Sequence, residues 1–468
     1  MSENQNLFAV LRQSADAAAS DAIERLIRDG SDRDLNRINV PALAAKTGLD
    51  EERLIAAFLH ATRLGLFDLS WNILCPGCGG VLDAAATLKS VEPGEYDCAL
   101  CAAGYEPTLD EMVEVTFTVS PRVRTIAAHD PHKLPIWEYC RQVLWSSGVD
   151  LPDDYEGLIE EITLDSLELP AGEKAILSLQ LPAEFLIVFD PVTHATQFLD
   201  VKGEPTRERQ ALGLMFDNVK AATGKSELRP GPLRITLENR ADVRVLPAIW
   251  IAGDKLHELL GRRRPFLTAK RLLTNQTFRD VYRANTLDVD QRLKITSLTF
   301  LFTDLKGSTE LYERVGDLAA FDLVRAHFRV LHEIVATEAG AVVKTIGDAV
   351  MATFATPDRA VAASLRMREA MRRLNAERGG EDLLLKIGIH EGPCLAVTLN
   401  DRQDYFGQTV NIASRVQNLA VSRAIFATES VVDNPQSSKL LESAGLTALP
   451  QRAALDGITA RVAVYEIP

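Results

Sequence analysis

The spacing of apolar residues changes along the chain, and its first part has a helical period. Over about residues 14–68, apolar positions recur every three to four residues, and a short helix is predicted to end at Gly48. Asp50 can then cap a longer amphipathic helix. Helix, turn, helix and a strand-like tail together predict a winged-helix-like unit over residues 1–72.

The middle of the chain alternates between apolar and polar residues. Runs such as EFLIVFD and LRITLEN are separated by turn signals such as Asp190-Pro191. This pattern predicts a β-rich regulatory domain over residues 111–264, with a sandwich as a candidate arrangement. Residues 265–292 are predicted to form a helical linker, and a signal-transmitting connector and a plain linker both remain open.

The last region, residues 293–468, begins with the run SLTFLFTDLKGST. Residues 297–303 are predicted to form a buried strand, and Asp304 stands where that strand ends. Further on, AVVKTIGDAVMATF predicts a hairpin with Asp348 at its turn. Each of these aspartates taken singly also fits ordinary turn chemistry.

Composition limits the class of protein and its partners. The 468 residues are 46% hydrophobic and 25% charged, which is typical of a soluble protein with several domains. No apolar run reaches the about 18 residues that a membrane span needs, and the first residues do not resemble a signal peptide. We therefore expect a cytoplasmic protein without a membrane partner. The net charge of −14 argues against nucleic acid as a partner.

Four of the six cysteines are clustered in two CxxC pairs. Cys75 and Cys78 are followed after nineteen residues by Cys98 and Cys101. Each CxxC turn directs two thiolates to one point, so the two pairs predict a zinc ribbon over residues 73–110. With four protein ligands, the single Zn²⁺ per chain would be structural. The alternative is four free thiols in a reduced cytosol.

The two aspartates are accompanied by a segment suited to phosphate. Gly307, Ser308 and Thr309 open a predicted helix, and the free N–H groups of a helix N-terminus bind anions. Placed side by side, Asp304 and Asp348 could hold two divalent ions for an in-line displacement.

A third segment, FGQTVNIASRV, carries Asn411 and Arg415 four residues apart. On a helix both project from the same face. An amide and a guanidinium so placed can hold a ribose and a phosphoryl group whose charge grows in the transition state. An isolated NxxxR pattern fits a solvated helix face equally well.

These three segments, in this order and at these separations, resemble the class III adenylyl and guanylyl cyclases. The resemblance covers a little over a third of the chain. It implies a ferredoxin-like βαββαβ catalytic domain, which is active as a homodimer with its sites at the interface. It also implies roles for individual residues: two Mg²⁺ or Mn²⁺ per site bound by Asp304, Asp348 and the carbonyl of Leu305, a ribose oriented by Asn411, and an α-phosphate stabilised by Arg415.

The resemblance also bears on the nucleotide. Where adenylyl cyclases of the commonest type have Lys and Asp, and guanylyl cyclases have Glu and Cys, this chain has Lys344 and Asp404. A lysine donates to the adenine N1 acceptor and an aspartate accepts from the N6 amine, whereas guanine presents the reverse pattern. The predicted reaction is therefore the conversion of ATP to 3′,5′-cyclic AMP and pyrophosphate.

One departure from the family pattern lies near the C-terminus. Where the family usually has a triphosphate-binding Lys in an L-K-G-like stretch, this chain has Asp456. Low turnover or dependence on activation is therefore expected, with an unknown ligand or protein acting on the N-terminal region. The alternatives are a guanylate or dual-substrate cyclase, a catalytically weak nucleotide-sensing scaffold, and a zinc-ribbon transcription regulator. The acidic charge disfavours the last of these.

Overall fold

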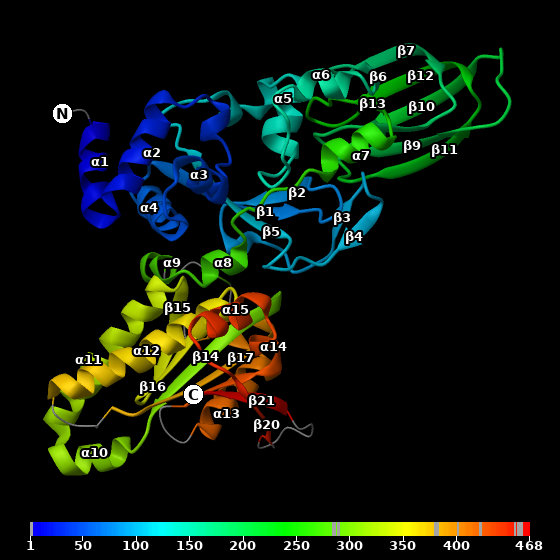
Figure 1. The fold of residues 1–468 in the computed structure, drawn as a ribbon. Coiled ribbons are helices and arrows are strands. Elements are labelled where there is room, and N and C mark those ends of the chain that lie inside the picture. Colours follow the sequence, from blue (N-terminus) through cyan, green and yellow to red (C-terminus); the bar gives the residue numbers. More distant parts are fainter. Residues whose placement is uncertain are drawn as a thin grey trace. The chain divides into compact units, whose positions relative to one another are not determined.

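The computed structural model describes residues 3–282, 287, 291–378, 383–399, 402–420, 424–453, 455 and 462–468 (Figure 1). The chain divides into two compact units, which are described separately below. The N-terminal unit comprises Met1–Ala86, Gly94–Pro107 and Glu111–Leu267, and the C-terminal unit comprises Thr87–Pro93, Thr108–Asp110 and Thr268–Pro468. Within the described part of the chain, no helix has the length and apolar character that a membrane crossing requires.

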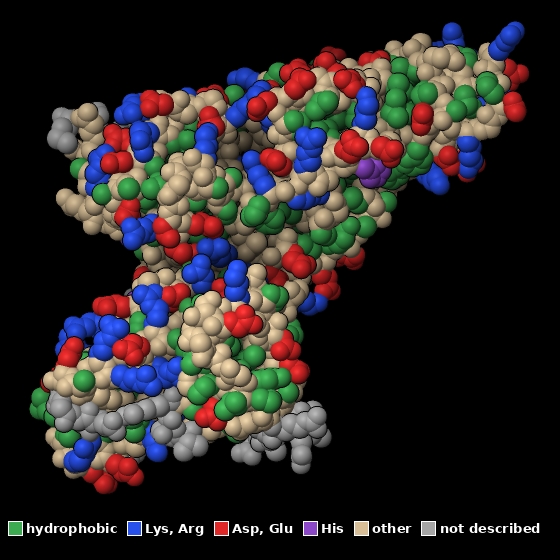
Figure 2. Space-filling view, in the orientation of Figure 1, with side chains coloured by type: hydrophobic (Ala, Val, Ile, Leu, Met, Phe, Trp, Pro, Cys, Tyr) green, Lys and Arg blue, Asp and Glu red, His purple; other side chains and the backbone are tan. Residues whose placement is uncertain are grey.

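The N-terminal unit begins with helices α1 (Glu3–Ser14), α2 (Ala17–Asp29), α3 (Val40–Thr47) and α4 (Glu51–Arg63). The predicted local signals are confirmed. Gly48 ends α3 with a left-handed φ of 68°, and the Asp50 carboxylate caps α4 by accepting from the Arg53 N–H at 3.0 Å. Acidic and basic side chains are intermixed on the face of these helices that Figure 2 displays.

The helices lead into a three-stranded sheet of order β2-β1-β5. Its strands are β1 (Phe67–Leu74), β2 (Val81–Ala85) and β5 (Val113–Val119). Strand β5 lies in the sequence range predicted for the β-rich domain, yet it pairs with β1 along its whole length. Phe58 of α4 packs on Phe67 and Phe117 with ring centroids 5.0 Å apart in both cases, so this sheet and the helices share one core.

Two further sheets form the β-rich part of the N-terminal unit. One has the order β10-β12-β7 and the other β11-β9-β8-β13-β6. Apolar residues of both sheets, such as Ile235 and Val188, belong to one buried cluster, as expected for alternating strands packed face to face. The elements are β3 (Tyr96–Cys98), β4 (Ala103–Tyr105), α5 (Ile136–Tyr139), α6 (Tyr155–Glu160), β6 (Thr163–Ser166), β7 (Lys174–Leu181), β8 (Phe185–Phe189), β9 (Thr196–Val201), β10 (Gln210–Phe216), β11 (Thr223–Leu228), β12 (Gly231–Asn239), β13 (Ala248–Ile251) and α7 (Asp254–Gly261).

The C-terminal unit is built on one mixed sheet of order β15-β16-β14-β17-β19-β21-β20, with β18 paired to β17. From β14 to β17 the elements follow the expected βαββαβ order, with the first helical segment divided into α10 and α11. The elements are α8 (Ala269–Leu273), α9 (Gln276–Val281), β14 (Leu293–Leu305), α10 (Ser308–Val315), α11 (Asp317–Thr337), β15 (Gly340–Ile346), β16 (Ala349–Phe354), α12 (Pro357–Arg378), β17 (Leu385–Leu399), β18 (Arg402–Phe406), α13 (Gln408–Leu419), β19 (Ile425–Thr428), α14 (Glu429–Val432), α15 (Pro435–Ser443), β20 (Leu449–Ala453) and β21 (Val462–Ile467).

The two faces of this sheet carry different helices. On β19, Ile425 and Ala427 join the cluster formed with α11 and α12, whereas Phe426 joins the cluster formed with α13. This follows from the period of two along a strand. Gly388 lets α13 approach β17 closely, because a Cβ at that position would lie 2.1 Å from the backbone nitrogen of Gln417.

The predicted linker forms two short helices rather than one. The Asn275 side chain accepts from the Phe278 N–H at 3.0 Å and so starts α9 as a separate helix. Both helices belong to the C-terminal unit.

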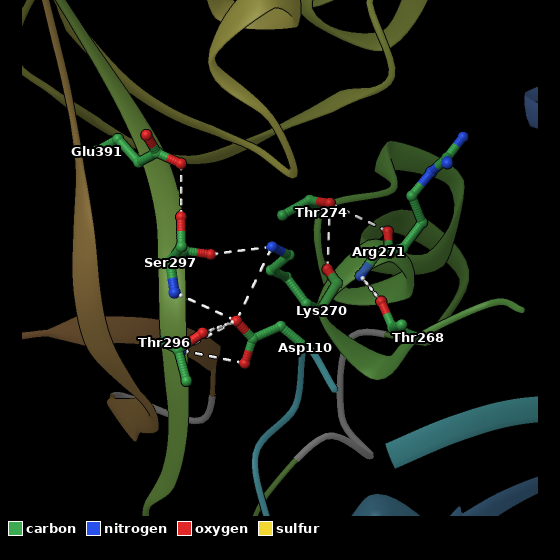
Figure 3. Close-up of polar contacts among 8 residues, drawn as sticks. All are labelled: Asp110, Thr268, Lys270, Arg271, Thr274, Thr296, Ser297 and Glu391. Atoms are coloured by element: carbon green, nitrogen blue, oxygen red, sulfur yellow. Dashed lines mark hydrogen bonds and ion pairs between the residues drawn. The ribbon is translucent and has the colours of Figure 1, made fainter. Parts of the chain in front are cut away.

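A short segment far away in sequence also belongs to the C-terminal unit. Residues 108–110 lie beside the start of β14, where the ladder with β17 is irregular. Figure 3 shows the Asp110 carboxylate facing this irregularity: it accepts from the backbone N–H of Thr296 at 3.0 Å and of Ser297 at 3.2 Å. The Lys270 ammonium donates to the Ser297 carbonyl at 3.1 Å. Asp110 thus satisfies donors that the bulged strand leaves without ladder partners.

Candidate active site

The two aspartates predicted to bind metal lie at the same end of adjacent strands in the C-terminal sheet. Asp304 is the penultimate residue of β14, and Asp348 occupies the two-residue turn between β15 and β16. Gly347 supplies the turn with a φ of +61°. The β14–β16 ladder ends at the pair Thr303–Val350, so the next residue of β14 lies beside this turn.

The two carboxylates have few protein partners. The Oδ2 atom of Asp348 is buried and has no hydrogen-bond partner among the described residues. The Oδ2 atom of Asp304 lies 3.4 Å from the ammonium nitrogen of Lys386, and its side chain is 30% exposed. A buried carboxylate oxygen without a donor is costly unless a cation or water satisfies it. The oxygen ligands that these two carboxylates offer therefore fit hard divalent cations such as Mg²⁺ or Mn²⁺.

His327 of α11 lies next to Asp348 and was not predicted from the sequence. Its side chain is fully buried, and neither ring nitrogen has a hydrogen-bond partner in the described part of the chain. Burial lowers the pKa of His327 to about 4, while the neighbouring Asp348 opposes this shift. The imidazole is therefore neutral at pH 7. In the sequence, nothing near His327 marks it as a residue of the site.

The segment after Asp304 turns into a helix as predicted. Gly307 adopts a φ of +71°, and its carbonyl accepts from the Leu311 N–H at 2.9 Å in the first turn of α10. Helix α10 begins at Ser308, and the side chains of Ser308 and Thr309 lie outside the described residues. Leu305 is the last residue of β14, and its side chain is buried.

The structure brings Lys344 and Asp404 together, although they are 60 residues apart. Lys344 lies on β15 and Asp404 on β18, and the ammonium donates to the Oδ2 atom of the carboxylate. Asp404 is buried, and its Oδ1 atom accepts from the Tyr405 N–H at 2.8 Å. The side chain of Lys344 is 41% exposed and borders a cavity of about 270 Å³.

Asn411 and Arg415 lie one turn apart on α13, as predicted. Asn411 is exposed and Arg415 is partly exposed. Among the described residues, neither side chain makes a hydrogen bond or ion pair with Asp304 or Asp348. One chain therefore presents the carboxylates and the Asn–Arg pair as separate groups. Asp456 lies outside the described residues.

The four predicted zinc ligands converge in the N-terminal unit. All four sulfur atoms lie within 4.8 Å of one another, and the Sγ atoms are 3.6 Å apart for Cys75 and Cys101 and 3.7 Å for Cys78 and Cys98. Three of the four residues are buried. A Cβ on Gly77 would lie 3.1 Å from the sulfur of Cys101, so the tight turn suits glycine. The cluster could hold a metal ion.

Comparison with known proteins finds a family match for each of the two regions of the chain. Residues 1–280 match a family of unknown function (DUF5939), and residues 291–447 match the adenylate and guanylate cyclase catalytic domain. An adenylate cyclase of Anabaena cylindrica is 29% identical over 185 residues, which are 36% of this chain and 36% of that protein. The human guanylate cyclase soluble subunit beta-2 is 29% identical over 132 residues, 26% of this chain and 21% of that protein.

The chain thus spans about a third or less of the length of these relatives. Among solved structures, the adenylyl cyclase CyaB of P. aeruginosa is 23% identical with a TM-score of 0.34, covering 38% of this chain and 96% of that one. The chain belongs to the DUF5939 family and carries at its C-terminus a class III nucleotide cyclase catalytic domain.

Proposed function

We propose that this protein is an adenylate cyclase, which converts ATP to 3′,5′-cyclic AMP and pyrophosphate. The observation that carries the proposal is the ion pair between Lys344 and the buried Asp404, beside a cavity in the catalytic unit. In this pair the lysine offers a donor for adenine N1, and the aspartate offers an acceptor for the N6 amine. Guanine would face a donor with its own N1–H and an acceptor with its O6. Unpaired buried polar groups of this kind reject the wrong base strongly.

The carboxylates fit the triphosphate end of the substrate. Asp304 and Asp348 would hold two divalent cations, with the carbonyl of Leu305 as a further ligand. The Oδ2 atom of Asp348, which has no hydrogen-bond partner in the described part of the chain, supports this assignment. When bound, such ions neutralise phosphate charge and lower the pKa of the ribose 3′-hydroxyl. The N–H groups at the start of α10, after Gly307, would receive phosphate oxygens.

The α13 pair would act on the sugar and the α-phosphate. Asn411 would orient the ribose, and Arg415 would donate to the α-phosphate as its negative charge increases. Among the described residues of one chain, neither makes a hydrogen bond or ion pair with the carboxylates. We therefore propose that a second copy supplies them together with Lys344 and Asp404. A symmetric homodimer then contains two complete sites, because each copy carries both sets.

We further propose that the four-cysteine cluster holds one structural Zn²⁺ as a zinc ribbon. Four thiolates complete a tetrahedral site and leave no open position for chemistry. The preceding helices, proposed as a winged-helix-like unit, and the β-rich sheets would then have a regulatory role, toward a ligand or protein partner rather than nucleic acid.

The test is to supply ATP and GTP separately to the full-length protein with Mn²⁺ and to identify the products. The proposal predicts cyclic AMP and pyrophosphate from ATP, with much slower conversion of GTP. Comparable turnover of both nucleotides would identify a dual-substrate cyclase, and turnover of GTP alone a guanylate cyclase. Nucleotide binding without any cyclic product would contradict the enzymatic assignment.

A further inference from the structure

Arg279 connects the two strands that carry the proposed base-reading pair. Its Nη2 atom donates to the carbonyl oxygen of Val343 at 3.3 Å and to that of Gln403 at 2.9 Å. These residues directly precede Lys344 and Asp404. A single guanidinium nitrogen of α9 thus bridges the backbone of β15 and β18 at the point where the two base-reading side chains project.

The bridge matters because no strand ladder fixes this distance. Strand β15 pairs with β16 and β18 pairs with β17, while β14 and β16 lie between β15 and β17 in the sheet order. The distance between the backbones of β15 and β18 is therefore set by contacts across a gap. In the described part of the chain these contacts include the ion pair between Lys344 and Asp404 and the Arg279 bridge beside it.

Helices α8 and α9 are themselves held on both sides of this gap. The Gln276 side-chain oxygen accepts from the Val342 N–H at 2.8 Å on β15. On β18, the Tyr405 hydroxyl donates to the Leu273 carbonyl at 3.4 Å, and its ring is buried. Arg279 is consequently placed by contacts that do not depend on its own side chain.

One buried nitrogen of Arg279 calls for an explanation. Its Nη1 atom is buried without a hydrogen-bond partner among the described residues, and the side chain lines the cavity that Lys344 borders. Burying an unsatisfied donor costs free energy, and buried unsatisfied groups concentrate where function requires them. An apolar side chain would pack α9 without this cost.

We propose that Arg279 is a positioning residue that fixes the spacing of Lys344 and Asp404 and thereby the preference for adenine over guanine. This inference rests on the proposed adenylate cyclase activity. Arg279 lies inside the range matched by the DUF5939 family, at residues 1–280. The end of that family region therefore takes part in substrate selection through Lys344 and Asp404.

A merely structural role for Arg279 makes a different prediction. Lost packing would lower the stability of the protein and would lower kcat/KM for ATP and for GTP by the same factor. The ratio of the two values would then not change. A lost bridge would let the two base-reading groups move apart, which weakens the discrimination and so changes the ratio. The ratio is therefore the measurement that separates the two roles.

The experiment compares full-length wild type with Arg279→Ala and Arg279→Lys. The lysine variant keeps the charge, but its ammonium ends one bond earlier and cannot bridge both carbonyls in the same way. Arg366→Ala is the matched control, since it removes another arginine contact of the catalytic unit, between α12 and Glu338, but leaves the bridge and the contacts of α9. We expect the kcat/KM ratio to fall about tenfold or more in both Arg279 variants and to stay near the wild-type value in the control.

Folded Arg279 variants with an unchanged ratio would overturn the inference while leaving the proposed function intact. If Arg279→Ala does not fold, Arg279→Lys decides. A wild-type protein that does not convert ATP would instead overturn the proposed function itself, so the two failures are distinguishable.

Discussion

The four thiols of the N-terminal unit lie within 4.8 Å of one another in a single chain. The catalytic unit instead offers two aspartates, Asp304 at a strand end and Asp348 in a turn, and the Oδ2 atom of Asp348 has no partner among the described residues. The thiols are mostly buried, and four of them would complete a coordination shell by themselves. The carboxylates supply only part of a shell and leave room for substrate oxygens and water. The difference fits the proposal of a resident structural ion at one site and exchangeable, substrate-linked ions at the other.

We expect the largest loss of activity from Asp348→Asn, which disrupts the carboxylate site. It removes the charge of a proposed metal ligand without changing the volume of the side chain, so activity should fall by about three orders of magnitude. Melting temperature should stay close to that of the wild type. Asp322→Asn, an exposed aspartate on α11 of the same unit, serves as the matched control and should change neither quantity.

Mixing two inactive chains tests whether the carboxylate site, unlike the cysteine site, needs a second copy. Asp304→Ala and Arg415→Ala should each be nearly inactive. In an equal mixture, half of the dimers are hybrids and each hybrid keeps one intact site, so about a quarter of wild-type activity should return. A mixture as inactive as its components would contradict a site shared between copies.

Cys98→Ser should remove the resident ion. We expect about one zinc per chain in the wild type and none in the variant, with a destabilised N-terminal unit, because metal binding free energy contributes to folding. Cys140→Ser removes a buried thiol outside the cluster and should keep the zinc. Metal analysis of freshly purified proteins measures both, and a wild type without zinc would refute the zinc assignment.

Asp110 is a carboxylate of the opposite kind to those of the proposed metal site. Hydrogen-bond donors of Thr296 and Ser297 already satisfy it (Figure 3). Asp110→Ala should lower the free energy of unfolding of the C-terminal unit by about 1–3 kcal/mol. Chemical denaturation followed by the loss of catalytic activity measures this. Asp322→Ala should lower this free energy of unfolding much less. If the two substitutions lower it equally, the Asp110 contacts contribute little.

The sequence predicted those features that depend on neighbouring residues. The Asp50 cap, the Gly347-Asp348 turn and the helix under Asn411 each involve hydrogen bonds or spacings within a few residues. The pairing of Lys344 with Asp404 was expected only through the resemblance to the cyclases, because nothing local marks two residues 60 positions apart as partners.

The remaining contacts could not be predicted from local pattern. Asp110 meets Thr296 over 186 residues, and Arg279 meets Gln403 over 124. Such contacts depend on how the sheets assemble, and a polar residue in a loop or short helix carries no signal of its distant partner. His327 was missed for the same reason, since its burial beside Asp348 follows from the packing of α11 on the hairpin.

The most direct test of the account is the metal dependence of cyclic AMP formation by full-length protein passed into metal-free buffer. With ATP supplied, we predict no cyclic AMP until Mg²⁺ or Mn²⁺ is added, and full activity afterwards, while bound zinc stays at about one per chain throughout. Cyclic AMP formation without added divalent ions, or restored only by zinc, would contradict the assignment of catalysis to the carboxylates and of structure to the thiols.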